Sequence, residues 1–239
     1  MNPRSRTQVL LALLAFPITG AHAAMSAANT ATPMMMAASG PTPIVGSRLS
    51  WRRGQAVLRD SERAGVHHGH GALIFRGKQV AIAIVARAPH HPDMSFETGG
   101  LTNPTLCVPQ GTQVTLEVMN MDYGPGMAHG LVITSAKPPY PVRLRRHLPH
   151  VLADIPALPP RSRARLQTAR YAEQTVRFIA GRPGTYYYIC PVPGHALAFR
   201  MYGRFIVYPA SLKTCPRSSK PDAHTTTRPA TPSDSRRPS

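Results

Sequence analysis

The stretch that decides the fold is GTYYYICPVPGHALAFRM, residues 184–201. It begins with aromatic and β-branched residues, which favour a β-strand. A second strand-like run, residues 203–208, follows it. Between the two runs stand one cysteine, one histidine and one methionine, which are Cys190, His195 and Met201. This strand, loop and strand pattern therefore places three side chains with metal-binding atoms on a single loop.

The three residue types indicate a particular metal. Thiolate and thioether are soft ligands that hold Cu(I), and imidazole suits both oxidation states of copper. A mononuclear blue-copper site also needs a second histidine, and His129 offers one on a loop between two other apolar runs. A cysteine on a strand is by itself usually a small core residue. The combination, with a Pro193-Gly194 turn that delivers His195, predicts a metal site.

The rest of the chain predicts an all-β domain with one helix. From Ala72 onward, apolar and β-branched runs recur at short intervals with Gly, Pro, Asn and Asp between them, as in a β-sandwich or barrel. Residues 47–63 instead predict a helix, with Ser50 as its N-cap and Gly65 after its end. The predicted strands are residues 72–75, 79–87, 94–97, 104–108, 112–120, 130–135, 174–180, 184–190 and 203–208.

The residue patterns at the two ends of the chain do not indicate a folded core. Residues 1–23 predict a secretory signal peptide with two arginines, a short apolar run and an Ala-His-Ala cleavage site. The alternative is an uncleaved anchor, but the apolar run is shorter than the ~20 residues that span a bilayer. Residues 24–46 predict a flexible leader and 209–239 a disordered basic tail. A single domain, residues 47–208, remains, and we expect it to work as a monomer in the periplasm.

One segment inside the domain breaks the strand rhythm. Residues 136–173 are rich in Pro and Arg and predict an insertion without strands, next to the site. The whole chain carries 28 Lys and Arg against 10 Asp and Glu, a formal charge of +18. A nucleic-acid binder is disfavoured because an export signal is present and no nucleic-acid-binding motif is evident. An acidic redox partner or an anionic membrane surface fits the charge better.

The remaining cysteines leave two alternatives open. An exported protein can join Cys107 and Cys215 in a disulfide. The sequence does not establish that their Cα atoms approach closely enough. The other interpretation is a buried thiol at Cys107, on a strand, and a loose thiol at Cys215 in the tail.

Several segments together resemble the cupredoxin family, with the rusticyanins nearest and the sulfocyanins next. The resemblance covers residues 47–208, and its carriers are GTYYYICPVPGHA, MYGRFIV, SFETGGLTNPTLCVPQGTQVTLEVMN and the PPYPV run after the first histidine loop. It implies a Greek-key β-sandwich with a short N-terminal helical extension and one type 1 copper. It also implies that His129, Cys190 and His195 are the ligands, with Met201 as the weak axial thioether.

The resemblance also implies a function and shows departures. It implies electron transfer between respiratory partners such as a c-type cytochrome, with iron(II) oxidation as one route. Five residues, Ala196–Arg200, separate the second histidine from Met201, where the rusticyanins have four. Met127 is therefore a competitor for the axial place. Asp122 falls roughly where the rusticyanins have an asparagine near the copper.

Other functions fit the residues less well. Cys190 has Ile189 and Pro191 beside it rather than the histidines that relay electrons in multicopper oxidases, so an enzyme is not expected. Copper storage or delivery is the alternative, because the histidines of 67–70 and 90–91 could hold further copper. For an electron carrier, we expect Ile189, Val192, Leu197 and Phe199 to line a water-poor shell that raises the reduction potential.

Overall fold

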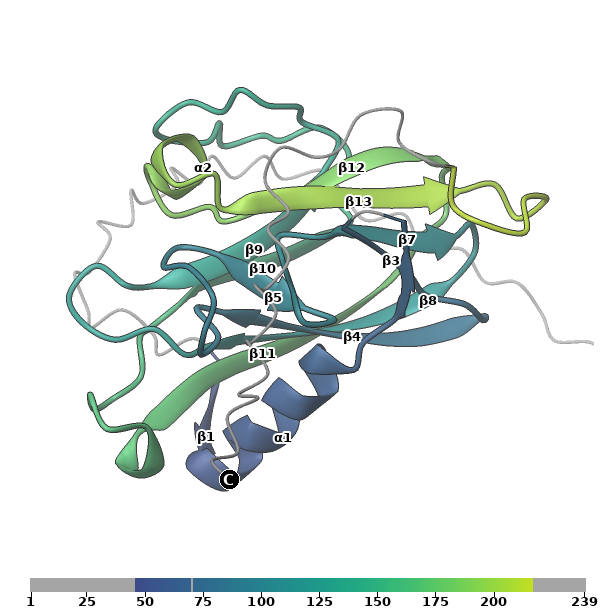
Figure 1. Ribbon diagram of the computed structural model, residues 1–239. Helices are drawn as coiled ribbons and strands as arrows, with labels where there is room; N and C mark the ends of the chain where they lie inside the picture. The colour runs from purple at the N-terminus through teal and green to yellow at the C-terminus, as the bar shows by residue number, and fades with distance from the viewer. Residues whose placement is uncertain (1–45, 70, 217–239) are drawn as a thin grey trace, which may run out of the picture. The chain divides into compact units, whose positions relative to one another are not determined.

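The computed structural model describes residues 46–69 and 71–216 (Figure 1). The strands of this part of the chain form two sheets. The first sheet has the order β1 (Ser47–Ser50), β11 (Arg170–Ile179), β8 (Gln113–Asn120), β4 (Gln79–Ala86), β5 (Phe96–Thr98) and β6 (Leu101–Thr102). The second has the order β10 (Ala153–Leu158), β9 (His129–Thr134), β12 (Gly184–Ile189), β13 (Tyr202–Tyr208), β7 (Thr105–Pro109), β3 (Ala72–Ile74) and β2 (Val66–His68).

The main core lies between the two sheets. Ile82 and Leu116 come from the first sheet, and Leu106 and Phe205 come from the second, and all four belong to one buried cluster. Most strand pairs are antiparallel, but β4 pairs with β8, and β7 with β13 and β3, in parallel. The predicted all-β sandwich is confirmed.

The first sheet is covered on its other face by helix α1 (Trp51–Glu62). Side chains alternate between the two faces of a strand, so in β4 Ile82 and Ile84 enter the main core while Val85 contacts the helix cluster. Gly54 permits a close approach, since a Cβ there would lie 3.2 Å from the Tyr171 ring. The predicted helical extension is therefore present from Trp51 onward, but residues 47–50, included in the predicted helix, form the edge strand β1. Ser50 stands at its N-cap in extended conformation, although its side chain makes no capping hydrogen bond.

A pair of residues fixes the two strands on either side of the loop that carries Cys190 and His195. Tyr188 on β12 lies opposite Gly203 on β13. A Cβ at position 203 would lie 2.1 Å from the Tyr188 hydroxyl oxygen, so only glycine leaves room for this ring. The hydroxyl donates a hydrogen bond of 2.6 Å to the Pro104 carbonyl. These contacts set the positions of the strand before Cys190 and of the strand after Met201.

The prediction that residues 136–173 contain no strand is wrong. This segment includes β10, which pairs with β9, and a 3-10 turn, η1 (Leu166–Thr168). Proline normally interrupts a strand because it lacks an N–H, but edge strands and bulges tolerate it. Strand β10 is an edge strand, and Pro156 lies where its register shifts between Ile155 and Leu158. The prolines therefore hid a strand whose alternate residues Ala153, Ile155 and Leu158 are buried.

The open question about the cysteines is settled in favour of the disulfide. Cys107 and Cys215 are bonded, with their Cα atoms 5.9 Å apart. The first residues of the predicted basic tail are thus attached to β7, and Cys215 is buried rather than loose. The predicted signal peptide, the leader up to residue 45 and the tail from 217 onward lie outside the described residues. Within the described ranges, no helix combines the length and the apolarity that a bilayer crossing requires.

Candidate metal centre

Three predicted ligands come together at one end of the second sheet. Cys190 follows the last residue of β12, and His195 begins the short helix α2 (His195–Ala198). His129 is the first residue of β9. Because β9 and β12 are antiparallel neighbours, with Ile189 opposite Val132, the start of one strand lies beside the end of the other. The sheet therefore brings together residues that are 61 positions apart in the chain.

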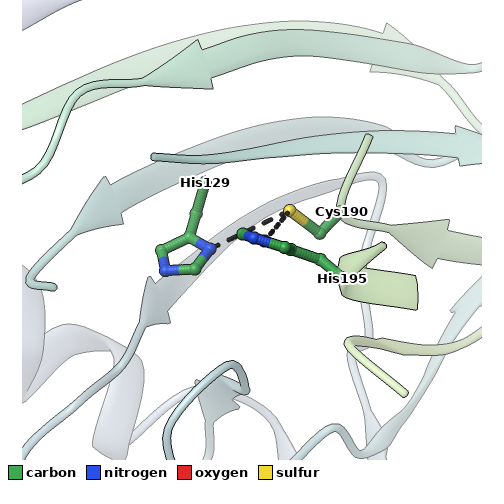
Figure 2. A group of neighbouring side chains, drawn as sticks. All are labelled: His129, Cys190 and His195. Atoms are coloured by element: carbon green, nitrogen blue, oxygen red, sulfur yellow. Dashed lines mark hydrogen bonds between the residues drawn. The ribbon is translucent and has the colours of Figure 1, made fainter. Parts of the chain in front are cut away.

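The side chains of these residues converge on one another (Figure 2). The Cys190 Sγ lies 3.4 Å from the Nδ1 of His195 and 3.9 Å from the Nδ1 of His129. All three donor atoms lie within 4.8 Å of one another. Cys190 and His129 have no exposed surface, and His195 keeps 6% of its surface exposed. The result is a compact, water-poor group of one sulfur and two imidazole nitrogens.

Burial governs the protonation of the cysteine. It raises the pKa of the Cys190 thiol to about 11, although the backbone N–H groups of Val192 and Gly130 donate to the sulfur and favour the thiolate. A thiolate is the form that binds a metal, and metal binding releases its proton. Gly130 has a second role, since a Cβ there would lie 2.6 Å from the Ile155 carbonyl oxygen of β10. Glycine at this position lets β9 approach β10 while its N–H reaches the sulfur.

Burial also keeps the downstream imidazole neutral. The pKa of His195 lies below its ordinary value because of burial and because His129 stands nearby, while Asp122 acts in the opposite direction. The ring centroids of His129 and His195 are 5.0 Å apart. A neutral imidazole has a free nitrogen lone pair, which is what a metal requires.

Asp122 contacts one of the predicted ligands, which the sequence did not reveal. Its Oδ2 lies 2.8 Å from the Nε2 of His129, which is the ring nitrogen that does not face Cys190. Burial pushes the pKa of Asp122 up, but hydrogen bonds from His129 and from the Tyr123 N–H outweigh it, so the pKa lies below its ordinary value. The signal in the sequence was a carboxylate in place of the asparagine of the resembling family.

Backbone hydrogen bonds hold Met201 close to the other predicted ligands. Its N–H donates to the His195 carbonyl at 3.2 Å, and its carbonyl accepts the N–H of Cys190 at 3.0 Å. The side chain is fully buried in the same cluster as Cys190. Between His195 and Met201 the chain forms α2, and Arg200 then adopts a left-handed conformation with φ 54°. Met127 is half-buried and packs against the same cluster, so it remains a competitor for the axial place.

The expected apolar shell is only partly present. Ile189 is buried and Val192 packs against the main core. Leu197, on α2, and Phe199, at its C-cap, are instead 47% and 54% exposed. The Phe199 ring lies 6.2 Å from the His195 ring in an edge-to-face arrangement. These two side chains therefore give an apolar surface beside His195 rather than a closed lining.

The donor set fits copper. Two imidazoles, one thiolate and one thioether form the set that is typical of a blue-copper site. The thioether is that of Met201, whose backbone is hydrogen-bonded to Cys190 and His195. In the part of the chain that the structure describes, no second group of three His, Cys, Asp or Glu residues lies close enough to hold a metal. His67 and His68 belong to the edge strand β2, and His70 lies outside the described residues.

Comparisons with known proteins support this interpretation. No protein-family profile matches the chain. Rusticyanin from Acidithiobacillus ferrooxidans is 35% identical over 135 residues, which are 56% of this chain and 80% of that protein. Rusticyanin from Acidithiobacillus ferridurans is also 35% identical over 135 residues, which are 66% of its length.

Solved structures give the same result. A structure described as the copper protein rusticyanin is 28% identical, with a TM-score of 0.57 over 67% of this chain and 96% of that one. Rusticyanin from Thiobacillus ferrooxidans is 30% identical, with a TM-score of 0.55 and the same coverage. The length of the match, the fold and the converging donor set agree, and the chain therefore belongs to the rusticyanin family of blue-copper cupredoxins.

Proposed function

We propose that this chain is a mononuclear electron-transfer protein that holds one type 1 copper ion. His129, Cys190 and His195 are the strong ligands, and Met201 supplies the weak axial thioether. The observation that carries the proposal is the convergence of three buried donor atoms within 4.8 Å of one another. When bound, copper supplies a one-electron change between Cu(II) and Cu(I).

The protein contributes a fixed and dry environment. The backbone N–H groups of Val192 and Gly130 donate to the Cys190 sulfur. The Met201 backbone bonds to both Cys190 and His195, so the ligand loop is closed upon itself. Hydrophobic surroundings and hydrogen bonds to the cysteine sulfur are the features that tune the potential of such a site. A water-poor site disfavours the more highly charged Cu(II), and we expect a potential above that of aqueous copper.

The absorption and EPR spectra of the copper-loaded protein test this proposal. We expect an intense visible thiolate-to-copper band and a narrow copper hyperfine splitting, and both should vanish in Cys190→Ser. Met201→Leu should change the EPR parameters and the potential, whereas Met127→Leu should not. Met119→Leu is the matched control, since Met119 is equally buried but lies in the cluster under α1. A larger change in Met127→Leu than in Met201→Leu would reassign the axial ligand, and a colourless copper complex would refute the proposal.

Copper storage or delivery is the second candidate, because histidines also occur on β2. The two functions differ in stoichiometry. Electron transfer requires one tightly bound copper per chain, which metal analysis after dialysis would measure. Several colourless copper ions per chain, lost together in His67→Ala and His68→Ala, would favour storage.

The basic insertion suggests how a redox partner docks. Its segment 136–150 lies against the ligand loop, since the Gly194 N–H donates to the Val142 carbonyl at 2.7 Å and Leu144 packs against the cluster of Ala196. Arg145 and Arg146 on this segment are exposed. An acidic partner such as a c-type cytochrome would therefore meet positive charge beside the site. We propose this surface as the docking site, in a periplasmic respiratory route that oxidises iron(II).

Electron-transfer rates at several salt concentrations test the docking proposal. We expect the rate with an acidic c-type cytochrome to fall as salt rises, because salt screens exposed charges. Arg145→Glu with Arg146→Glu should lower the rate, and Arg177→Glu is the control because it lies exposed on the first sheet. A rate that is independent of salt would count against an acidic partner. Binding of the chain to anionic vesicles at low salt would favour a membrane surface instead.

A further inference from the structure

The side of His129 that faces away from the site is occupied by a carboxylate. The Nδ1 of His129 points to Cys190, and the Nε2 lies 2.8 Å from the Oδ2 of Asp122. His129 is fully buried, and Asp122 is only 7% exposed. An ionised carboxylate can only accept hydrogen bonds, so in the neutral imidazole that a metal requires the proton stands on Nε2. This leaves the lone pair of Nδ1 directed toward the other donors.

Asp122 is itself held in place on both sides. Its Oδ1 accepts the N–H of Tyr123 at 2.8 Å, and its own N–H donates to the Oδ1 of Asn120 at 2.9 Å. Its carbonyl accepts the N–H of Arg161 at 2.8 Å. Asn120 also donates to the carbonyls of Met127 and Leu158, both at 2.9 Å. The carboxylate is therefore fixed by the loop that carries it and by the strands on which that loop rests.

The basic insertion completes this support. The Arg161 guanidinium donates to the Met121 carbonyl, and to the carbonyls of Arg163 and Ala164 at 3.1 Å each. It also lies over the Tyr123 ring, with its central carbon 5.2 Å from the ring centroid. Arg161 thus joins the insertion to the two residues that flank Asp122. The hydrogen bond from His129 to Asp122 is part of a built network rather than a chance contact.

We propose that Asp122 is a positioning residue that fixes the Nε2–H tautomer of His129, and whose negative charge lowers the reduction potential of the copper. The proposal rests on the proposed function, since it concerns the same site. A carboxylate behind a ligating imidazole orients the ring and makes it a stronger donor. A fixed negative charge also stabilises Cu(II) more than Cu(I), because Cu(II) carries the larger positive charge. Asp122 therefore opposes the rise in potential that the dry surroundings produce.

Three substitutions of Asp122 separate the effect of its charge from its effect on the orientation of the His129 ring. In Asp122→Asn the amide oxygen can still accept the Nε2–H, but the charge is lost. We expect the preference for Cu(II) over Cu(I) to fall about tenfold, a rise in potential of about 59 mV for one electron, with copper retained. In Asp122→Ala the ring loses its partner, and we expect copper affinity to fall about 10- to 100-fold. Asp122→Glu should recover much of both properties.

The matched control is Asp154→Asn, which removes the same charge from an exposed position on β10. Its potential should stay close to that of the unchanged protein. Equal potentials for Asp122→Asn and Asp154→Asn would overturn the role of the charge. Thermal unfolding of each variant shows whether it is folded, and Asp122→Asn keeps the test valid if Asp122→Ala does not fold.

A measurement without copper tests the tautomer independently of the proposed function. Nitrogen-15 NMR of the metal-free protein should show the proton of His129 on Nε2, and a mixture of tautomers in Asp122→Ala. A proton on Nδ1 in the unchanged protein would refute the positioning role. Failure of the chain to bind copper would refute the proposed function and the effect on potential, while the NMR result would still decide the tautomer.

Discussion

Two buried carboxyl groups in different regions of the molecule respond to burial in opposite ways. Asp122 lies behind the metal centre, and Glu97 lies on β5 beside helix α1. Each accepts two hydrogen bonds, Asp122 from His129 and the Tyr123 N–H, and Glu97 from the Ser61 hydroxyl and the Gly100 N–H. The pKa of Asp122 lies below its ordinary value, whereas burial raises the pKa of Glu97 to about 7.

Because the number of donors is the same, depth and neighbouring charge must make the difference. Glu97 has no exposed surface, and the negative charge of Glu62 raises its pKa further. Asp122 keeps a small exposed fraction, and His129 and Arg87 lower its pKa. The metal region therefore keeps a carboxylate charged, and the helix region keeps one neutral in acid. A hydrogen-bond count alone would not distinguish them.

The disulfide provides a reference that touches neither carboxyl group. Cys107 and Cys215 close a loop of 108 residues, and removing a cross-link of this span costs about 5 kcal/mol of unfolding free energy. We expect Cys215→Ala to lose about this amount in urea unfolding. The pH dependence from Glu97 and the copper potential should both stay the same. A change in either would show that the two regions are coupled through the whole fold.

The largest local effect should come from Glu97. Its folded pKa of about 7 lies above the ordinary 4.5, so its contribution to stability is complete below pH ~4.5 and is lost as the pH rises through ~7. A difference of this size is about 3 kcal/mol. Urea unfolding between pH 4 and 8 should show this loss, and Glu97→Gln should remove most of it.

Glu117→Gln is the control for this experiment. Burial also raises the pKa of Glu117, but this residue is only half-buried, so its substitution should remove a smaller part of the pH dependence. The contribution of Asp122 to the pH dependence of stability has the opposite sign, because a lowered folded pKa gives stability that is lost as the pH falls. If Glu97→Gln leaves the loss above pH 4.5 unchanged, the proposed contrast between the two carboxyl groups is wrong.

Removing one hydrogen-bond donor from Glu97 should increase the pH dependence of stability that this carboxyl group produces. Ser61→Ala deletes the hydroxyl that bonds to Glu97, and we expect a cost of about 1 kcal/mol at pH 8, where the carboxylate must be solvated by the protein. Below pH 5 the cost should be smaller, because the group is then neutral. Ser47→Ala is the matched control, since its hydroxyl bonds to the carboxylate of Glu173 at 2.6 Å in a more exposed pair. An equal loss at both pH values would mean that Ser61 acts through packing alone.

The smallest effect should follow from loosening the support of Asp122. Lysine keeps the charge of Arg161 but cannot reach three carbonyls at once, so we expect Arg161→Lys to cost about 0.5 kcal/mol. Hydrogen exchange should become faster at Met121 and Tyr123, while Glu97 keeps its pH dependence. Arg163→Lys, at an exposed position, is the control. Unchanged exchange in Arg161→Lys would remove the insertion from the network around Asp122.

Much of the centre was determined by local sequence. A strand that ends in Cys190, a Pro-Gly turn and His195 form a continuous segment, so backbone propensities and short spacing predict both the strand and the loop. The N-terminal helix followed from its N-cap and from the periodicity of its apolar residues. Long strands such as β4 and β8 were predicted for the same reason, since their apolar residues extend over eight positions.

Other features depended on which strands became neighbours. Strand β10 was missed because its prolines are tolerated only at an edge and a bulge, and the sequence does not say which strand is at the edge. The disulfide required the Cα atoms of Cys107 and Cys215 to approach within 5.9 Å. The contact of Asp122 with His129 required the loop between them to turn back on itself, which Asn120 and Arg161 stabilise from separate segments.

The sequence by itself therefore determined the donor set, because Cys190 and His195 share one short loop, and it determined the class of fold through the spacing of its apolar runs. Only the tertiary structure decided what surrounds those donors. The charge of Asp122, the neutrality of Glu97 in acid and the path of the insertion all depend on distances between residues far apart in the chain. Burial and electrostatic interactions act through space, so a linear pattern does not contain them.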